Sequence, residues 1–168
     1  KNKEYDVFYL INFFGKYQKI NNKFFNNKIV IEDNVFLPFF ENSRKLKNWI
    51  GFNSLRKVTP LADGSLIKST LILKDYYILK KQANFVKYKY KGKKLKYDYL
   101  NKKKRLTEKD YLSYFEKGEK TLNKQKEIFG ISNLSLFKYF DFVLNIDSEL
   151  QIRKNNYQIL ANKLKLYS

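Results

Sequence analysis

The sequence predicts an α+β fold in which a small antiparallel sheet is packed by several amphipathic helices. Short β-prone runs punctuated by turn signals occupy much of the first hundred residues, whereas apolar side chains recur at helical spacing after residue 107. The two kinds of element do not alternate strictly, which favours α+β over a parallel α/β sheet. The length fits one domain, 1–168, with a basic hairpin and loop at 84–105 and a helical part at 107–168.

The first forty residues predict one helix, one strand and a turn. Apolar residues at helical spacing predict an amphipathic helix over 5–19, although Gly15 is unfavourable inside it. The run 28–32 predicts a short strand, and Pro38 predicts extended or turning backbone over 35–40. Both kinds of regular structure are therefore expected early in the chain.

The next segment carries a helix-capping signal, a turn and a β-rich run. Asn42 or Ser43 is a suitable N-cap for a short helix over 43–52. Residues 62–65 predict a turn, because they combine Asp, Gly and Ser, and the β-rich run 66–73 follows directly. We expect this run to form a strand.

Segment 84–105 is the most informative stretch of the chain. Between residues 87 and 105 it has ten Lys and Arg residues against one acid, a net charge of +9 out of +19 for the whole chain. The tyrosines that alternate with these lysines are Tyr88, Tyr90, Tyr97 and Tyr99. Period-two alternation predicts a β-hairpin at about 85–100 that turns at Gly92. One face is then aromatic and the other cationic.

A cationic face of this kind binds polyanions, and structured RNA is the partner it fits best, because lysines neutralise phosphates and release counterions. The contact residues expected in this segment are Lys87, Lys89, Lys91, Lys93, Lys94, Lys96, Lys102, Lys103, Lys104 and Arg105. The tyrosines are either core residues, which their shared face favours, or stacking platforms for unpaired bases. The run 102–105 has two interpretations, an exposed loop that contacts rRNA, which we favour, and a nuclear-import signal.

A second basic patch surrounds Trp49. Its members are Arg44, Lys45, Lys47, Arg56 and Lys57. The patch includes two of the chain's four arginines, whose guanidinium groups bind phosphate in a bidentate fork that Lys cannot reproduce. We expect RNA contact here too. The alternative is a helix whose charged side is solvated while Trp49 anchors the core.

The C-terminal part predicts three further elements. A capping box at Thr107 opens a long helix to about Ile128, with Gly130 as its stop. The buried stripe expected for this helix is Tyr111, Phe115, Leu122 and Phe129. The apolar run 134–144 is either a buried strand or a helix. Ser148 can cap a last helix, whose apolar register is Leu150, Tyr157, Leu160 or Ala161, and Leu164.

Several residue types that enzymes use are missing from the chain. There is no Cys and no His, so thiol nucleophiles, imidazole bases and the commonest zinc ligands are excluded. The six glycines occur singly and form no phosphate-binding loop. We therefore expect no enzymatic activity, no metal, no cofactor and no small-molecule substrate. No apolar run approaches the roughly 18–20 residues that span a bilayer, so we also expect no transmembrane segment.

The composition is biased toward residues with codons rich in A and T. Lys, Asn, Phe, Tyr, Ile and Leu make up about two-thirds of the chain. In this general character the sequence resembles organelle-encoded mitochondrial ribosomal proteins from AT-rich, ciliate-like genomes. The resemblance implies a structural constituent of a mitochondrial ribosome in the matrix, with rRNA and neighbouring ribosomal proteins as partners. It covers composition alone, so no family residues are carried over.

Two other function classes stay open. A soluble accessory subunit of an organellar respiratory-chain or ATP synthase complex would turn the same charge toward anionic lipid or acidic neighbours. Residues 61–64, Leu-Ala-Asp-Gly, also resemble the end of the LAGLIDADG motif of homing endonucleases, which implies a fragment of an endonuclease or maturase with Asp63 as a metal ligand. That motif lies on a helix, and Pro60 interrupts any helix here, so we favour an Asp-Gly turn.

Overall fold

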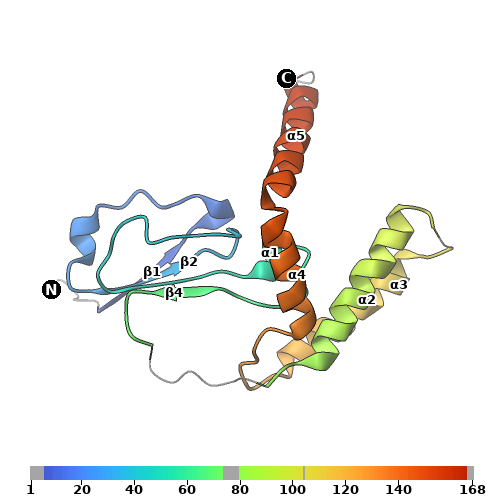
Figure 1. Ribbon diagram of the computed structural model, residues 1–168, viewed down its shortest axis with the longest axis horizontal. Helices are drawn as coiled ribbons and strands as arrows, with labels where there is room; N and C mark the ends of the chain where they lie inside the picture. Colours follow the sequence, from blue (N-terminus) through green and yellow to red (C-terminus); the bar gives the residue numbers. More distant parts are fainter. Residues whose placement is uncertain (1–5, 74–79, 104, 166–168) are drawn as a thin grey trace.

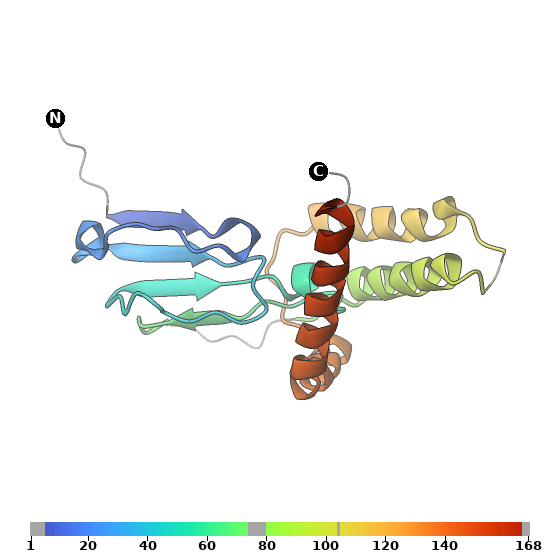
Figure 2. The same ribbon diagram turned by 90° about the horizontal axis from the view of Figure 1, so that it is seen from above.

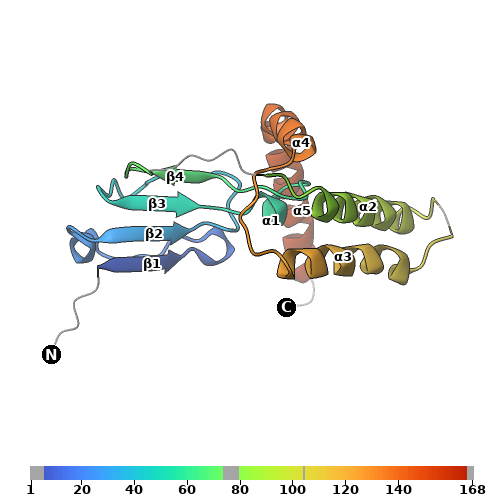
Figure 3. The same ribbon diagram turned by 90° about the horizontal axis from the view of Figure 1, so that it is seen from below.

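The computed structural model describes residues 6–73, 80–103 and 105–165. Its strands are β1 (Val7–Ile11), β2 (Ile29–Asp33), β3 (Trp49–Phe52) and β4 (Ile67–Ser69). They form one sheet in the order β1-β2-β3-β4, in which the first three strands are parallel and β4 is antiparallel to β3. The sheet lies at one end of the molecule and a pair of long helices at the other (Figures 1 and 3).

The helices are α1 (Leu55–Val58), α2 (Ala83–Leu100), α3 (Glu108–Asn123), α4 (Asn133–Leu144) and α5 (Ile146–Lys165). Sheet and helices together confirm the α+β class. The prediction of an antiparallel sheet was wrong, because only β4 pairs in that sense. Parallel neighbours need connections of a dozen or more residues, and the segments 12–28 and 34–48 supply them. Two short 3₁₀ turns, η1 (Phe13–Gly15) and η2 (Asn22–Phe25), lie in the first of these.

The core of the sheet combines apolar packing with one buried carboxylate. Val30 on β2 is fully buried, and the residues clustered with it are Leu10, Phe25, Phe40 and Trp49. Glu32, on the same strand, is also fully buried. It accepts hydrogen bonds from Trp49 Nε1 at 3.0 Å and from Arg44 Nε at 3.4 Å. A buried charge is costly unless it is paired, so these two partners hold the segment before β3 against the sheet.

Two predicted helices in the first half of the chain are wrong. Val7–Ile11, inside the expected helix 5–19, forms β1, and Trp49–Phe52, inside the expected helix 43–52, forms β3. Pairing with β2 outweighs the helical spacing of the apolar residues, because local propensity is a weak preference in short segments. The strand predicted at 28–32 is confirmed as β2. The strand predicted at 66–73 is confirmed as β4 over Ile67–Ser69.

The predicted basic hairpin at 85–100 is also wrong, because this segment is the 18-residue helix α2. The segment also has a helical periodicity: Tyr88, Gly92, Leu95 and Tyr99 recur every three or four residues and form a helical stripe. That stripe packs on α3, with ring centroids 6.4 Å apart for Tyr88 and Tyr114 and 5.6 Å apart for Tyr99 and Tyr111. Lys is a good helix former, which also favours α2 over a hairpin.

Gly92 lies in the middle of this packing rather than at a turn. A Cβ atom added there would be 2.7 Å from Cε1 of Phe115 on α3, closer than such atoms pack. The absence of a side chain therefore lets the ring of Phe115 rest directly on the α2 backbone. Figures 2 and 3 show α2 and α3 running side by side beyond the sheet.

The predicted capping box of α3 is confirmed. The backbone N–H of Thr107 donates to Oδ2 of Asp110 at 2.6 Å, and the reciprocal bond is also present. Of the expected buried stripe, Tyr111 is buried, and the remaining three residues, Phe115, Leu122 and Phe129, are half-buried. The helix ends at Asn123, before the expected stop at Gly130, whose N–H donates instead to the carbonyl of Lys80.

The last two helices leave a large apolar surface uncovered. Residues 134–144 prove to be helical, and Phe137, Phe140 and Leu144 on α4 are 73%, 59% and 85% exposed. The predicted last helix is α5, which starts before Ser148 and buries none of its residues, so its expected apolar register stays a prediction. It projects past the body of the molecule (Figure 1), and Arg153 donates to the carbonyl of Val58 at 2.6 Å. We call seven of the exposed apolar residues of these two helices the α4–α5 stripe: Phe137, Phe140, Leu144, Leu150, Tyr157, Leu160 and Leu164.

Replacing Gly92 with Leu tests the packing of α2 on α3. The new side chain meets the Phe115 ring, so we expect the free energy of unfolding in urea to fall by about 1–3 kcal/mol. Combining it with Phe115→Ala should recover part of this loss, because the smaller residue opens the space that Leu needs. Strictly additive effects of the two substitutions would contradict the contact. Gly118→Ala is the control, since the nearest atoms to a Cβ there belong to the Lys89 side chain, at 3.1 Å or more, and not to the Phe115 ring.

Candidate nucleic-acid interface

The helical form of α2 divides its lysines between solvent and the protein interior. Lys87, Lys91 and Lys94 recur at i, i+4 and i+7, so they share one helical face, and all three are exposed. None of them forms an ion pair with a described residue. We call these three residues the lysine face. The structure thus keeps part of the predicted cationic surface while changing the element that carries it.

The residues that follow α2 extend the exposed charge. Lys102, Lys103 and Arg105 are exposed, and the ammonium group of Lys103 lies 4.5 Å from the ring centroid of Tyr97. Lys104, also a predicted contact, lies outside the described residues. Lys102 has a positive φ of 52°, where the chain leaves the helix. The chain therefore presents cations from α2 onto the segment that connects it to α3.

Two other lysines of α2, Lys89 and Lys96, contact side chains of α3. Lys89 forms an ion pair with Glu119 of α3, and its ammonium lies 5.6 Å and 5.4 Å from the ring centroids of Phe85 and Phe115. The hydrogen bond from Lys89 is the main reason that the pKa of Glu119 lies below its ordinary value. Lys96 is exposed but lies 5.9 Å from the Tyr111 ring centroid. These contacts join α2 to α3 and leave Lys89 partly neutralised.

Lys93 is the most perturbed cation in the described part of the chain. Its ammonium donates to the carbonyl of Pro60 at 2.9 Å and to that of Leu61 at 2.5 Å. Burial lowers its pKa from 10.5 to about 8, and the nearby charges of Lys89, Arg56 and Lys138 add to the effect. The sequence pattern could not reveal this, because α1, α2 and α4 meet only in the folded chain.

The fold brings part of the second predicted patch next to α2. Arg56 and Lys57 on α1 line a cavity of about 230 Å³ together with Lys89, Lys93 and Glu119. Arg56 Nη1 lies 3.6 Å from Oε1 of Glu119. We call this site the basic pocket. It gathers four cations from two predicted patches around one carboxylate, which the sequence analysis did not identify as a functional residue.

The remaining residues of the second patch lie in the segment before β3 and have other roles. Arg44 donates to the carbonyls of Ile20, at 2.9 Å, and Gln18, besides contacting Glu32, so its guanidinium ties loops together. Its side chain is only 12% exposed. Lys45 and Lys47 are exposed beside it. Trp49 is only 2% exposed, so it is a core residue, as the alternative interpretation of this patch expected. It belongs to strand β3 and not to a helix.

The tyrosines of α2 are mainly packing residues. Tyr88 and Tyr99 contact tyrosines of α3, and the Tyr90 hydroxyl lies 3.0 Å from Oγ of Ser135 on α4. Tyr97 differs, since it is 55% exposed. The interpretation of these residues as core groups therefore fits three of the four. Tyr97, with Lys103 over its ring, is the position suited to stacking on a base.

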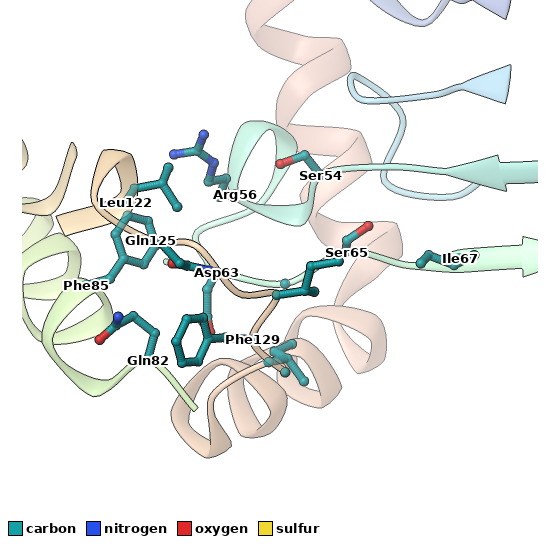
Figure 4. Close-up of a pocket in the computed structure, with 14 residues that line it drawn as sticks. Ser54, Arg56, Asp63, Ser65, Ile67, Gln82, Phe85, Leu122, Gln125 and Phe129 are labelled. Atoms are coloured by element: carbon teal, nitrogen blue, oxygen red, sulfur yellow. The ribbon is translucent and has the colours of Figure 1, made fainter. Parts of the chain in front are cut away.

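A second cavity, of about 410 Å³, lies where α1, the start of α2 and the end of α3 meet (Figure 4). Asp63 lines it, but both of its carboxylate oxygens accept hydrogen bonds from Ser132, at 2.8 Å from the backbone N–H and 2.9 Å from the hydroxyl. Asp63 thereby fixes the start of α4. In the described ranges, no three acids, His or Cys gather as a metal site would require, and residues 61–64 are not helical.

Comparison of the chain with protein-family models, with curated proteins and with solved structures finds no match. In the part of the chain that the structure describes, none of the helices combines the length and apolar character needed to cross a membrane. Any functional inference for this protein therefore rests on its own side chains and their arrangement.

The pKa of Lys93 provides a direct test of the site. We expect its Cε resonance, followed by NMR in lysine-labelled protein, to titrate near pH 8, well below the 10.5 of an ordinary lysine. An unfolded lysine keeps its proton up to about pH 10.5, so unfolding takes up a proton between pH 8 and 10.5. The contribution of Lys93 therefore makes stability rise with pH in that window. A Lys93 titration near pH 10.5 would disprove the burial of its charge.

Proposed function

We propose that this protein is a non-catalytic RNA-binding protein and a structural constituent of a ribosome, most specifically a mitochondrial ribosome in the matrix. The lysine face is the observation that carries the proposal. It presents three exposed lysines, none ion-paired with a described residue, on one face of α2, and Lys102, Lys103 and Arg105 continue the charge. Its partners are rRNA and neighbouring ribosomal proteins.

The arrangement suits a phosphate backbone better than a single small anion. Lys87 and Lys94 are seven residues apart on α2, which places them about 10 Å apart along the helix axis. Separate phosphates can therefore meet separate lysines, and each contact releases counterions. Because α2 packs on α3 through a different face, which includes Tyr88 and Tyr99, the orientation of the helix that carries these lysines is fixed before RNA arrives. Such contacts position a protein on folded RNA without reading its sequence.

The α4–α5 stripe favours membership of a larger assembly. Exposed apolar surface of this extent marks contact with another macromolecule. In a ribosome, a neighbouring protein would cover it. The same observation favours the second candidate, an accessory subunit of an organellar respiratory-chain or ATP synthase complex. The two candidates differ in whether RNA holds the protein in its assembly.

Replacing Lys87, Lys91 and Lys94 with Gln tests the lysine face. If each lysine meets one phosphate, the slope of log affinity against log salt should become shallower by about 2–3 for binding to a folded rRNA fragment. Stability should change by no more than about 0.5 kcal/mol, because the three side chains are exposed. The control, Lys16, Lys19 and Lys23→Gln, removes the same charge from exposed positions in the sheet half. An unchanged slope in the lysine-face variant would overturn its role.

Sedimentation of a native lysate separates the two assemblies. We expect the protein to migrate with a ribosomal particle and to leave it after RNase treatment. Migration with a detergent-solubilised membrane complex, unaffected by RNase, would support the accessory-subunit candidate and contradict the ribosomal one. Following the chain by mass spectrometry in every fraction, with a known ribosomal protein as the marker, makes the outcome unambiguous.

A further inference from the structure

The basic pocket has an excess of positive charge that its own residues do not neutralise. Arg56 and Lys57 come from α1, and Lys89 and Lys93 from α2, whereas Glu119 of α3 is the one acid that lines it. The net charge of its lining is therefore +3. Repulsion between these cations opposes their gathering, and it contributes to the lowered pKa of Lys93. An anion bound in the pocket would relieve that repulsion.

The cations of the pocket are held in place before any ligand binds. Lys93 is fixed by the carbonyls of Pro60 and Leu61, which use two of its three N–H groups. Lys89 is fixed by Glu119 and by two aromatic rings. Side-chain ordering is a main cost of binding, and here the fold has already met much of it. Lys57, exposed at the pocket, leaves it accessible from solvent.

The shape and donors of the pocket fit a phosphate group. Its volume of about 230 Å³ accommodates a phosphate with part of an attached sugar. Arg56 supplies a guanidinium, whose fork matches two phosphate oxygens, and its side chain remains 32% exposed beside Glu119. The lysines supply ammonium donors on the facing helix. Glu119 orients Arg56 and Lys89 without balancing the four positive charges.

We propose that the basic pocket binds one phosphate group, either a phosphodiester within the RNA or a terminal phosphate. This inference rests on the proposed function for the source of the phosphate, while the site itself is defined by Arg56, Lys57, Lys89 and Lys93. The lysine face then follows the backbone in the open, and the pocket holds a single phosphate at a fixed point. Together they set the position of the RNA relative to α1 and α2.

The variant Arg56→Gln and Lys57→Gln tests the pocket and keeps the structural lysines of α2. We expect the affinity for an RNA oligonucleotide to fall by about ten- to a hundredfold, the size of a lost charged hydrogen bond. The salt slope should become shallower by about 0.7–0.9, as for one phosphate. Lys16→Gln with Lys19→Gln removes equal charge from the sheet half and serves as the control. Circular dichroism verifies that each variant is folded.

The outcomes separate the two proposals. If the pocket variant binds like its control while the lysine-face variant loses affinity, the pocket assignment is wrong and the proposed function stands. If all variants bind RNA like the unmodified protein, both fail. An effect of the pocket variant larger than that of its control supports the inference.

NMR of lysine-labelled protein identifies the source of the phosphate. Inorganic phosphate, a 5′-phosphorylated oligonucleotide and its 5′-hydroxyl counterpart are added separately, and the Lys93 Cε resonance is followed. A shift with both oligonucleotides indicates a phosphodiester, and a shift with only the phosphorylated one indicates a terminal phosphate. Binding should also raise the pKa of Lys93 above about 8, against the groups that surround it: Arg56, Lys57, Lys89, Glu119 and Lys138. No shift of Lys93 with any of the three ligands would overturn the proposal.

Discussion

The packing of α2 on α3 is the contact on which the functional surface depends. Phe115 rests on the backbone at Gly92, with tyrosine pairs on either side of it. This contact fixes the rotation of α2 about its own axis. Lys87, Lys91 and Lys94 consequently face solvent, and Lys93 faces α1. A rotation of α2 that turned these three lysines toward α3 would bury their charges without partners, which is costly.

The net charge of +19 is larger than the positive charge that is available to bind an anion. Of its 35 basic residues, several are used internally. Arg44 pairs with a buried glutamate and with loop carbonyls, Arg153 ties α5 to α1, and Lys89 joins α2 to α3. Lys and Arg are the most frequent long polar residues of this chain. They therefore donate structural hydrogen bonds as well as being available to anions. Only the basic residues that remain exposed can take part in the proposed RNA contact.

The molecule has two kinds of exposed surface that a partner would cover, one charged and the other apolar. The lysine face and the basic pocket carry uncompensated charge, whereas the α4–α5 stripe exposes apolar side chains. α5 has no buried residue, so its stability as a helix has little support from the rest of the chain. The combination fits a component that contacts nucleic acid with one surface and protein with another. A protein inside a ribonucleoprotein particle makes both kinds of contact.

The sequence by itself determined the α+β class, the capped start of α3 and the concentration of charge at 84–105, because each depends on local pattern or composition. It did not determine that 85–100 is a helix, since Tyr and Lys alternate there at a two-residue period while Tyr88, Gly92, Leu95 and Tyr99 also fit a helical period. The packing of Phe115 on Gly92 exists only in the helical form. Nor could it join Arg56 to Lys93, which are far apart along the chain. Only the tertiary structure decides which charges converge, because convergence depends on packing between elements and not on spacing within them.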